Sequence, residues 1–308
     1  MTPLPGLPAR VQVYEVGVRD GLQNEAQIVP VAVKAELVRR LVAAGQTAVE
    51  VTSFVSPKWV PQLADAEELL AAVHDLLDAV RMPVLVPNEK GLDRALAAGV
   101  REIAVFGSAT ETFAQRNLNR SVAESLEMFA PVVSRARAEG LAVRGYLSMC
   151  YGDPWEGDVA PETVAGIARR LVDLGATELS MGDTIGVATP GQVVALLDAL
   201  AAQGIDVAQV AVHFHDTYGQ ALANTLTALQ HGVTIVDASA GGLGGCPYAK
   251  SATGNLATED VLWQLHGLGI ETGIDLDAMV ATSSWLADEL GRPSASRVVN
   301  ALAGKGAD

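Results

Sequence analysis

The sequence has few cysteines, few aromatic residues and no long apolar run. Of its 308 residues two are cysteines, Cys150 and Cys246, and 5% are aromatic. Two cysteines are too few for a disulfide framework, so we expect both to be free thiols. No stretch of about eighteen apolar residues occurs, and the N-terminus lacks an apolar segment behind a basic start. These absences argue against a membrane partner and a secretory signal, and predict a cytoplasmic protein.

Positive charge is also scarce. The chain has 21 Lys and Arg residues against 36 Asp and Glu residues, a formal net charge of -15. Such a field repels polyanions, so we expect no nucleic-acid partner, and an anionic substrate would need a local positive site. The hydrophobic share of 49% and the charged share of 19% are typical of a globular protein with a large core.

A repeated pattern runs through most of the chain. An Ala/Leu/Val-rich segment of helical period ends in glycine, and a short β-prone run follows; the glycines are Gly45, Gly99, Gly140, Gly175, Gly204 and Gly232. Runs at 11–16 and 82–87 bring the expected strands to eight, and helical stretches such as 31–44, 62–79 and 218–231 lie between strands. The alternation predicts a (β/α)8 TIM barrel. A doubly wound open sheet is the alternative, weakened because no Gly-rich dinucleotide fingerprint follows the first strand.

About seventy residues follow the eighth expected strand. They contain a Gly-rich loop at 241–255 and helical segments near 257–267, 275–290 and 293–303. No linker separates them from the barrel, expected at about 11–240. We therefore predict one catalytic domain over 1–308, with a C-terminal helical extension over 257–303.

Reactive groups of such barrels lie at the carboxyl ends of the strands. The polar residues expected there are Arg19, Asp20, Glu50, Arg144, Asp183, His213, His215 and Asp216. We expect all of them to face one cavity.

The stretch AVHFHDTYGQ (211–220) places His213 and His215 on the same face of a strand, where two imidazoles can chelate a metal. A hydrogen-bonded histidine pair filling the barrel mouth is the alternative. Asp20 would be a third ligand if the first strand neighbours the eighth, although Asp20-Gly21 also suits a plain turn. With the amide oxygen of Asn255 this set suits octahedral Mg²⁺ or Mn²⁺, and without Asn255 it also suits non-haem iron.

Two further residues have both a chemical and a structural interpretation. Glu50 stands in a β-branched run, where an unpaired carboxylate is costly, so we expect it to pair with Arg19, either for chemistry or as a structural ion pair. Cys246 lies in GGLGGCPY, where a thiol can act as an acid or a nucleophile or be inert.

Five segments together resemble hydroxymethylglutaryl-CoA lyases: EVGVRDGLQNE (15–25), VEVTSFVSPKWVPQLAD (49–65), MGDTIGVATPG (181–191), VHFHDTYGQALANTLTALQ (212–230) and GGLGGCPYAKSATGNLATEDV (241–261). The likeness runs from about residue 11 to 290. It implies a (β/α)8 barrel that uses Mg²⁺ or Mn²⁺ and cleaves 3-hydroxy-3-methylglutaryl-CoA to acetyl-CoA and acetoacetate, in leucine and ketone-body catabolism. An acyl-CoA partner and a homo-oligomer, a dimer, are expected with it.

The resemblance also implies roles for particular residues. The metal ligands are Asp20, His213 and His215, with Asn255 as a further or intermittent one. Arg19 stabilises the oxyanion of the departing enolate, Glu50 holds Arg19, and Cys246 is the loop thiol near the reacting carbon. His213 or Asp20 is the candidate proton shuttle. The substrate site is lined by Arg144, Ser180 and Asp183 besides Arg19.

The sequence departs from the family pattern at three places: Val18 where proline is common, Phe214 where cysteine is frequent, and SMCYGDPWEGD after the fifth strand, which bears on acyl-chain preference. The nearest alternative activity is cleavage of a longer branched 3-hydroxyglutaryl-CoA, such as the isohexenyl analogue. A condensing acyltransferase related to isopropylmalate or homocitrate synthase is a second, but these usually read HND where this chain has HDTYGQALANT. A barrel kept as a binding module would lack a ligand or the arginine, and a metal-dependent hydrolase would carry its histidine pair on the first strand.

Overall fold

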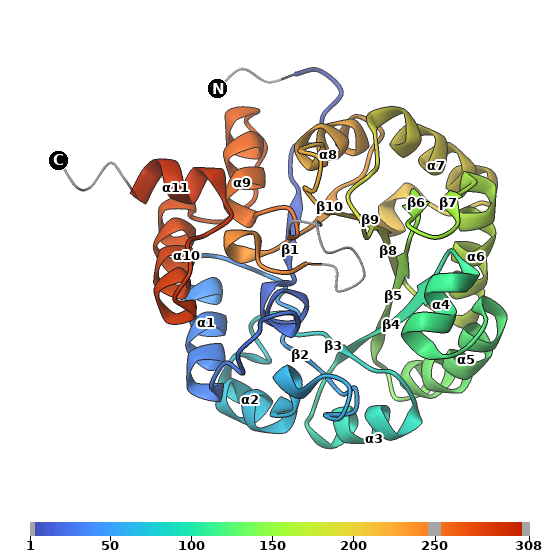
Figure 1. The fold of residues 1–308 in the computed structure, drawn as a ribbon, viewed down its shortest axis with the longest axis horizontal. Helices are drawn as coiled ribbons and strands as arrows, with labels where there is room; N and C mark the ends of the chain where they lie inside the picture. The colour runs from blue at the N-terminus through green and yellow to red at the C-terminus, as the bar shows by residue number, and fades with distance from the viewer. Residues whose placement is uncertain (1–3, 246–253, 304–308) are drawn as a thin grey trace.

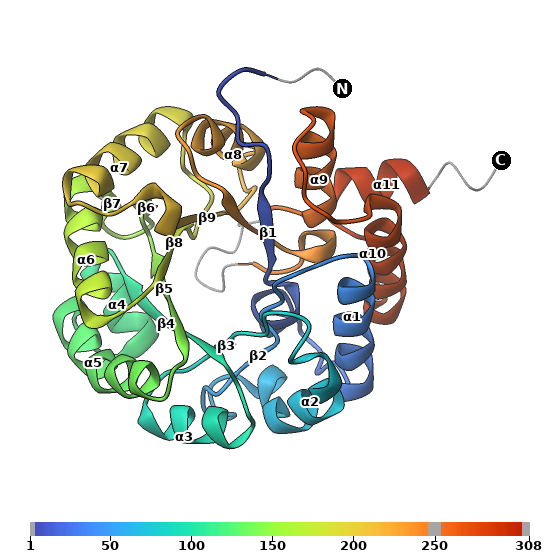
Figure 2. The same ribbon diagram turned by 180° about the vertical axis from the view of Figure 1, so that it is seen from behind.

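The computed structural model describes residues 4–245 and 254–303. Eight parallel strands form one curled sheet in the order β1-β10-β9-β8-β5-β4-β3-β2, and helices surround it (Figures 1 and 2). The strands are β1 (Gln12–Glu15), β2 (Thr52–Ser53), β3 (Val84–Leu85), β4 (Glu102–Ser108), β5 (Ala142–Ser148), β8 (Glu178–Asp183), β9 (Val210–Phe214) and β10 (Ile235–Ala238). The predicted TIM-barrel fold is confirmed.

The sheet closes between its first two strands. The backbone N–H of Glu15 donates to the carbonyl of Ala48 at 3.0 Å, and the N–H of Glu50 donates to the carbonyl of Glu15 at 2.8 Å. On the other side β1 pairs in parallel with β10. The carboxyl ends of the first, second and last strands therefore meet at one mouth.

The outer ring consists of α1 (Val31–Ala43), α2 (Ala66–Ala72), α3 (Glu89–Ala97), α4 (Glu111–Leu118), α5 (Val122–Ala138), α6 (Pro161–Leu174), α7 (Pro190–Ala202) and α8 (Ala221–Gln230). Their apolar faces pack on strands that are buried almost throughout, and this layer is the main core. Short turns complete the chain: the π-helix η1 (Gly17–Gly21), η2 (Pro61–Leu63), η3 (His74–Leu76), η4 (Val207–Gln209) and η5 (Ala240–Gly242). Among the described residues no helix combines the length and the apolar character needed to cross a bilayer.

The C-terminal extension consists of α9 (Thr258–Gly267), α10 (Leu276–Leu290) and α11 (Arg297–Ala303). In Figures 1 and 2 these helices stand beside α1 and α8, on the side where the barrel closes. The backbone N–H of Asp275 donates to the carbonyl of Ala44, at the end of α1, at 2.8 Å. The single-domain organisation stays a prediction. The hydrogen bond between Asp275 and Ala44 is in keeping with it, because it joins the extension to the barrel.

Some predicted element bounds were wrong. The stretch 62–79 is not one helix, because Val73 leaves helical dihedral angles after α2 and a separate turn follows. The last helix begins at Arg297 and not at 293, because the intervening residues hydrogen-bond to η5. A small hairpin, β6 (Gly152–Asp153) and β7 (Gly157–Asp158), occupies the segment after β5.

Candidate active site

Arg19 and Asp20 lie in the π-helix η1, directly after β1. In this turn the backbone N–H groups of Asp20 and Gly21 donate hydrogen bonds to the carbonyl of Val16, at 2.7 and 3.2 Å. Single π-turns are rare and often occur at functional sites, because they turn consecutive side chains toward one region. Arg19 is only 6% exposed.

Glu50 holds the Arg19 guanidinium, as predicted from its place in a β-branched run. Its Oε2 lies 2.8 Å from Arg19 Nε and 2.7 Å from Nη2, and Arg19 Nη1 donates to Asp20 Oδ1 at 2.8 Å. The hydroxyl of Tyr146 on β5 donates to the same Glu50 oxygen at 3.0 Å. A buried acid is thus satisfied by one cation and one phenol, which fixes the arginine.

Burial and neighbouring charge set the pKa values in this cluster. Burial lowers the pKa of Arg19, but Glu50 and Asp20 outweigh it and hold the pKa above its ordinary value. Burial raises the pKa of Asp20, yet Arg19 and His213 bring it down to about 2. Burial raises the pKa of Glu50, and Arg19 opposes the rise. Arg19 and Asp20 are therefore charged at neutral pH.

His213 and His215 share one face of β9 and its extension, with ring centroids 5.4 Å apart. His213 Nδ1 lies 3.2 Å from Oδ2 of Asp237 on β10. Burial lowers the pKa of His213, but Asp237 outweighs it and raises the value. Burial, followed by the charge of His213, lowers the pKa of His215 to about 4, so this imidazole is neutral at pH 7.

These side chains can hold a metal ion. One ligand atom from each of Asp20, His213 and His215 lies within 4.8 Å of the others. Asn255 pairs with His215 through a β-bridge, and its Nδ2 donates to Asp20 Oδ2 at 2.8 Å. Two polar atoms here, Asn255 Oδ1 and His215 Nδ1, are buried with no hydrogen-bond partner among the described residues. An unsatisfied amide oxygen next to a carboxylate and two imidazoles fits a divalent cation, because a cation would satisfy it.

A buried network that sequence reasoning did not find lies against His213. Its centre is Asp237, whose Oδ1 accepts from Arg144 Nη2 at 2.6 Å and whose Oδ2 accepts from Ser180 Oγ at 2.8 Å. The Arg144 guanidinium carbon lies 3.7 Å from the centroid of the Tyr14 ring. An acid inside the β-branched run VTIVDASA was a usable signal, the same one that identified Glu50.

Three residues expected to line the substrate site have protein partners in the structure. Arg144 and Ser180 are fully buried on Asp237. Asp183 is 1% exposed and accepts from the backbone N–H of Val187 and Ala188 at 2.9 and 3.0 Å. Burial raises the pKa of Asp183 to about 6, partly offset by these hydrogen bonds. Their contact with substrate stays a prediction.

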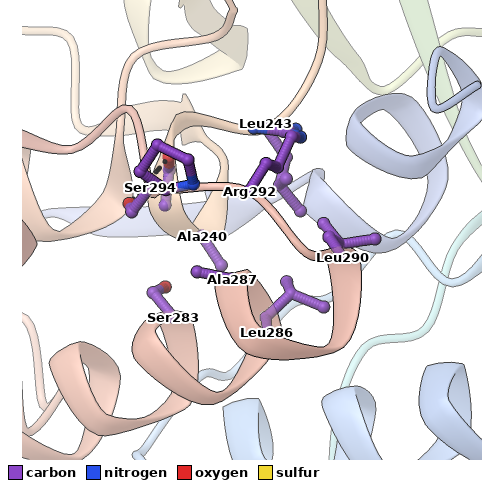
Figure 3. A pocket seen from close by; sticks show the side chains of 10 residues that line it. Ala240, Leu243, Ser283, Leu286, Ala287, Leu290, Arg292 and Ser294 are labelled. Atoms are coloured by element: carbon purple, nitrogen blue, oxygen red, sulfur yellow. Dashed lines mark hydrogen bonds between the residues drawn. The ribbon is translucent and has the colours of Figure 1, made fainter.

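Cys246 lies outside the described residues, but the base of its loop is described. Two buried acids hold that base: Glu15 Oε1 accepts from Ala240 N–H at 2.9 Å, and Glu259 Oε2 accepts from Gly241 N–H at 3.0 Å. A cavity of about 10 Å³ lies between this segment and the end of α10, and Figure 3 shows the side chains that line it. No metal-ligand candidate lines it, so it belongs to the packing of the extension against the loop base.

The HMGL-like family profile matches residues 10–286 of the chain. The chain belongs to the HMGL-like family. A mitochondrial hydroxymethylglutaryl-CoA lyase of Arabidopsis thaliana is 52% identical over 96% of this chain, which spans 63% of that relative's length. The crystal structure of hydroxymethylglutaryl-CoA lyase from Pseudomonas aeruginosa is 50% identical, covers 97% of this chain and 99% of its own, and superposes with a TM-score of 0.94.

A third relative of this HMGL-like chain bears on ligands. The structure of an HMG-CoA lyase from Acenitobacter baumannii, in complex with coenzyme A and 3-methylmalate, is 35% identical, covers 98% of this chain and 97% of its own, and has a TM-score of 0.90. Other relatives are named as mitochondrial or as cytoplasmic enzymes, so they leave the predicted compartment untested.

Proposed function

We propose that this HMGL-like protein cleaves 3-hydroxy-3-methylglutaryl-CoA to acetyl-CoA and acetoacetate. One observation carries the proposal: a buried arginine, held by Glu50 and Asp20, stands beside the Asp20, His213 and His215 cluster that can hold a metal. A retro-Claisen cleavage needs such a pair of positive groups, because negative charge develops on the departing enolate. The names of relatives near 50% identity support the same activity.

We propose Mg²⁺ or Mn²⁺ as the metal, held by Asp20, His213, His215 and the Oδ1 of Asn255. Carboxylate, amide and imidazole donors with further positions for substrate oxygens suit these ions. When bound, the ion would polarise the substrate oxygens that it gathers.

Arg19 supplies the oxyanion contact in this proposal. A guanidinium has five N–H donors, of which three serve Glu50 and Asp20. Two remain for a substrate oxygen. Glu50 and the hydroxyl of Tyr146 keep the guanidinium in place, so its orientation costs nothing at the moment of reaction.

Two proton transfers complete the reaction. The tertiary hydroxyl must lose a proton, and the carbanion of acetyl-CoA must gain one. Because His213 Nδ1 is engaged by Asp237, we favour Asp20 over His213 as the proton acceptor. We propose Cys246 as the acid for the second transfer, on the resemblance of its loop to those of the family.

A substrate panel tests the proposal. Metal-loaded, reduced protein is expected to release acetoacetate from 3-hydroxy-3-methylglutaryl-CoA, to lose activity with EDTA, and to regain it with Mg²⁺ or Mn²⁺. A separate arm offers the longer isohexenyl analogue. Turnover of that analogue alone would assign the chain to the alternative lyase activity, and turnover of neither would refute both.

We also propose that the CoA thioester is the bound form of the substrate and that the protein works as a homodimer in the cytoplasm. The coenzyme A complex of the Acenitobacter baumannii relative supports the first point. Light scattering on the eluting protein checks the second, with a mass of about twice 32.0 kDa expected.

A further inference from the structure

Asp237 lies directly beneath one of the two metal-site histidines. In the parallel ladder between β9 and β10, Asp237 is the register partner of His213. Side chains at such positions point to the same side of the sheet, so the contact follows from the strand pairing. The carboxylate Oδ2 lies 3.2 Å from His213 Nδ1, and the Asp237 side chain is fully buried.

The partners of Asp237 hold its carboxylate in place. Arg144 donates to Oδ1 at 2.6 Å, and Ser180 donates to Oδ2 at 2.8 Å. Arg144 Nη1 also lies 3.3 Å from Glu178 Oε1, so the guanidinium is held between two carboxylates and fixes Asp237. The carboxylate oxygen so placed accepts the Nδ1 proton of His213, which leaves the Nε2 lone pair for a ligand.

His213 and His215 therefore differ. Asp237 contacts Nδ1 of His213, whereas Nδ1 of His215 is buried with no hydrogen-bond partner among the described residues. On this basis, and resting on the proposed metal-dependent lyase function, we propose that Asp237 is a positioning residue of the metal site. It holds His213 in the tautomer and ring orientation that present Nε2 to a divalent cation, and Arg144 and Ser180 keep it in place.

Equilibrium Mn²⁺ binding, followed by the electron paramagnetic resonance of the free ion, tests the proposal without recourse to turnover. Asp237→Asn is expected to weaken Mn²⁺ binding about 10- to 100-fold, the usual cost of losing such a partner. Because this change removes the closer of the two carboxylates that pair with the buried Arg144, the double variant Asp237→Asn/Arg144→Met is measured beside it. Glu102→Gln is the matched control: it removes a buried carboxylate that pairs with Arg81 at the opposite end of the barrel.

The outcomes separate the proposals. Weaker binding in a folded Asp237 variant, with Glu102→Gln unchanged, supports the role of Asp237. Nitrogen NMR would then also show that His213 loses its Nδ1–H tautomer preference in the variant. Binding within about threefold of wild type in a folded Asp237 variant would overturn the role while leaving the lyase proposal intact. Absence of Mn²⁺ and Mg²⁺ binding by the wild-type protein would overturn the metal site itself.

Discussion

Replacement of Arg19 by lysine tests the chemistry most directly. The guanidinium serves Glu50 through Nε and Nη2 and Asp20 through Nη1, and keeps two N–H groups for substrate. Lysine keeps the positive charge but has only three donors on a compact ammonium, so it cannot hold both carboxylates and also reach a substrate oxygen.

The structure indicates the size of the effect. Loss of one oriented donor to a developing oxyanion costs about 3 kcal/mol, so kcat is expected to fall by 10²-fold or more. KM is expected to change by less than about tenfold, because the contact strengthens in the transition state and not in the ground state. The assay is acetoacetate release under saturating Mn²⁺.

A control variant shows whether the fall in kcat is specific to the active-site arginine. Arg39→Lys alters an exposed arginine that pairs with Asp75, and it is expected to keep wild-type kcat. Mn²⁺ binding by Arg19→Lys is expected to stay within a few-fold of wild type, since all proposed ligands remain. If Arg19→Lys keeps more than about a tenth of wild-type kcat, the oxyanion role assigned to Arg19 is wrong.

Two further predictions concern stability. Gly45 has φ +100°, and a Cβ there would overlap the carbonyl oxygen of Gly273, whereas Gly99 has φ +74° and open space around it. In urea unfolding, the free energy of unfolding should therefore fall by about 3 kcal/mol in Gly45→Ala and by about 1 kcal/mol in Gly99→Ala. Equal losses would contradict the docking of the extension. Burial raises the pKa of Glu259 to about 8, so the pKa in the folded protein exceeds the value in the unfolded chain. The contribution of Glu259 to folding stability is therefore full below pH 4.5 and is lost as the pH rises through 8. Melting curves should show stability falling on the order of 3 kcal/mol more from pH 6 to 9 in wild type than in Glu259→Gln, and parallel curves would rule out this ionisation.

Much of the barrel was predictable because helix-ending glycines and β-branched runs repeat along the chain. Gly175, for example, closes α6 with φ +118°, as its place after a helical run indicated. Element ends were less predictable, because tertiary contacts decide them. The last helix starts late since the backbone N–H of Ala295 donates to Gly241, a contact between segments far apart in sequence.

In the candidate site, too, some residues could be predicted from the sequence and others could not. Residues that are conspicuous in their local sequence, such as Glu50 within AVEVTSF and the histidine pair, were identified, and the contact between Glu50 and Arg19 is present. The acid in VTIVDASA marked Asp237 as unusual, but its contact with His213 could not be predicted, because only the register of β9 and β10 places it there. Tyr146 was missed for a similar reason, since its hydroxyl matters only once β5 brings it to Glu50.

The candidate metal ligands come from opposite ends of the barrel sequence. Asp20 follows β1, the histidines lie in and just after β9, and β10 pairs with both of these strands. A divalent ion held there would cross-link early and late parts of the polypeptide and would bind only after the ring had formed. Its binding energy would thus add to the cohesion of the whole fold, and the melting temperature would rise with metal concentration.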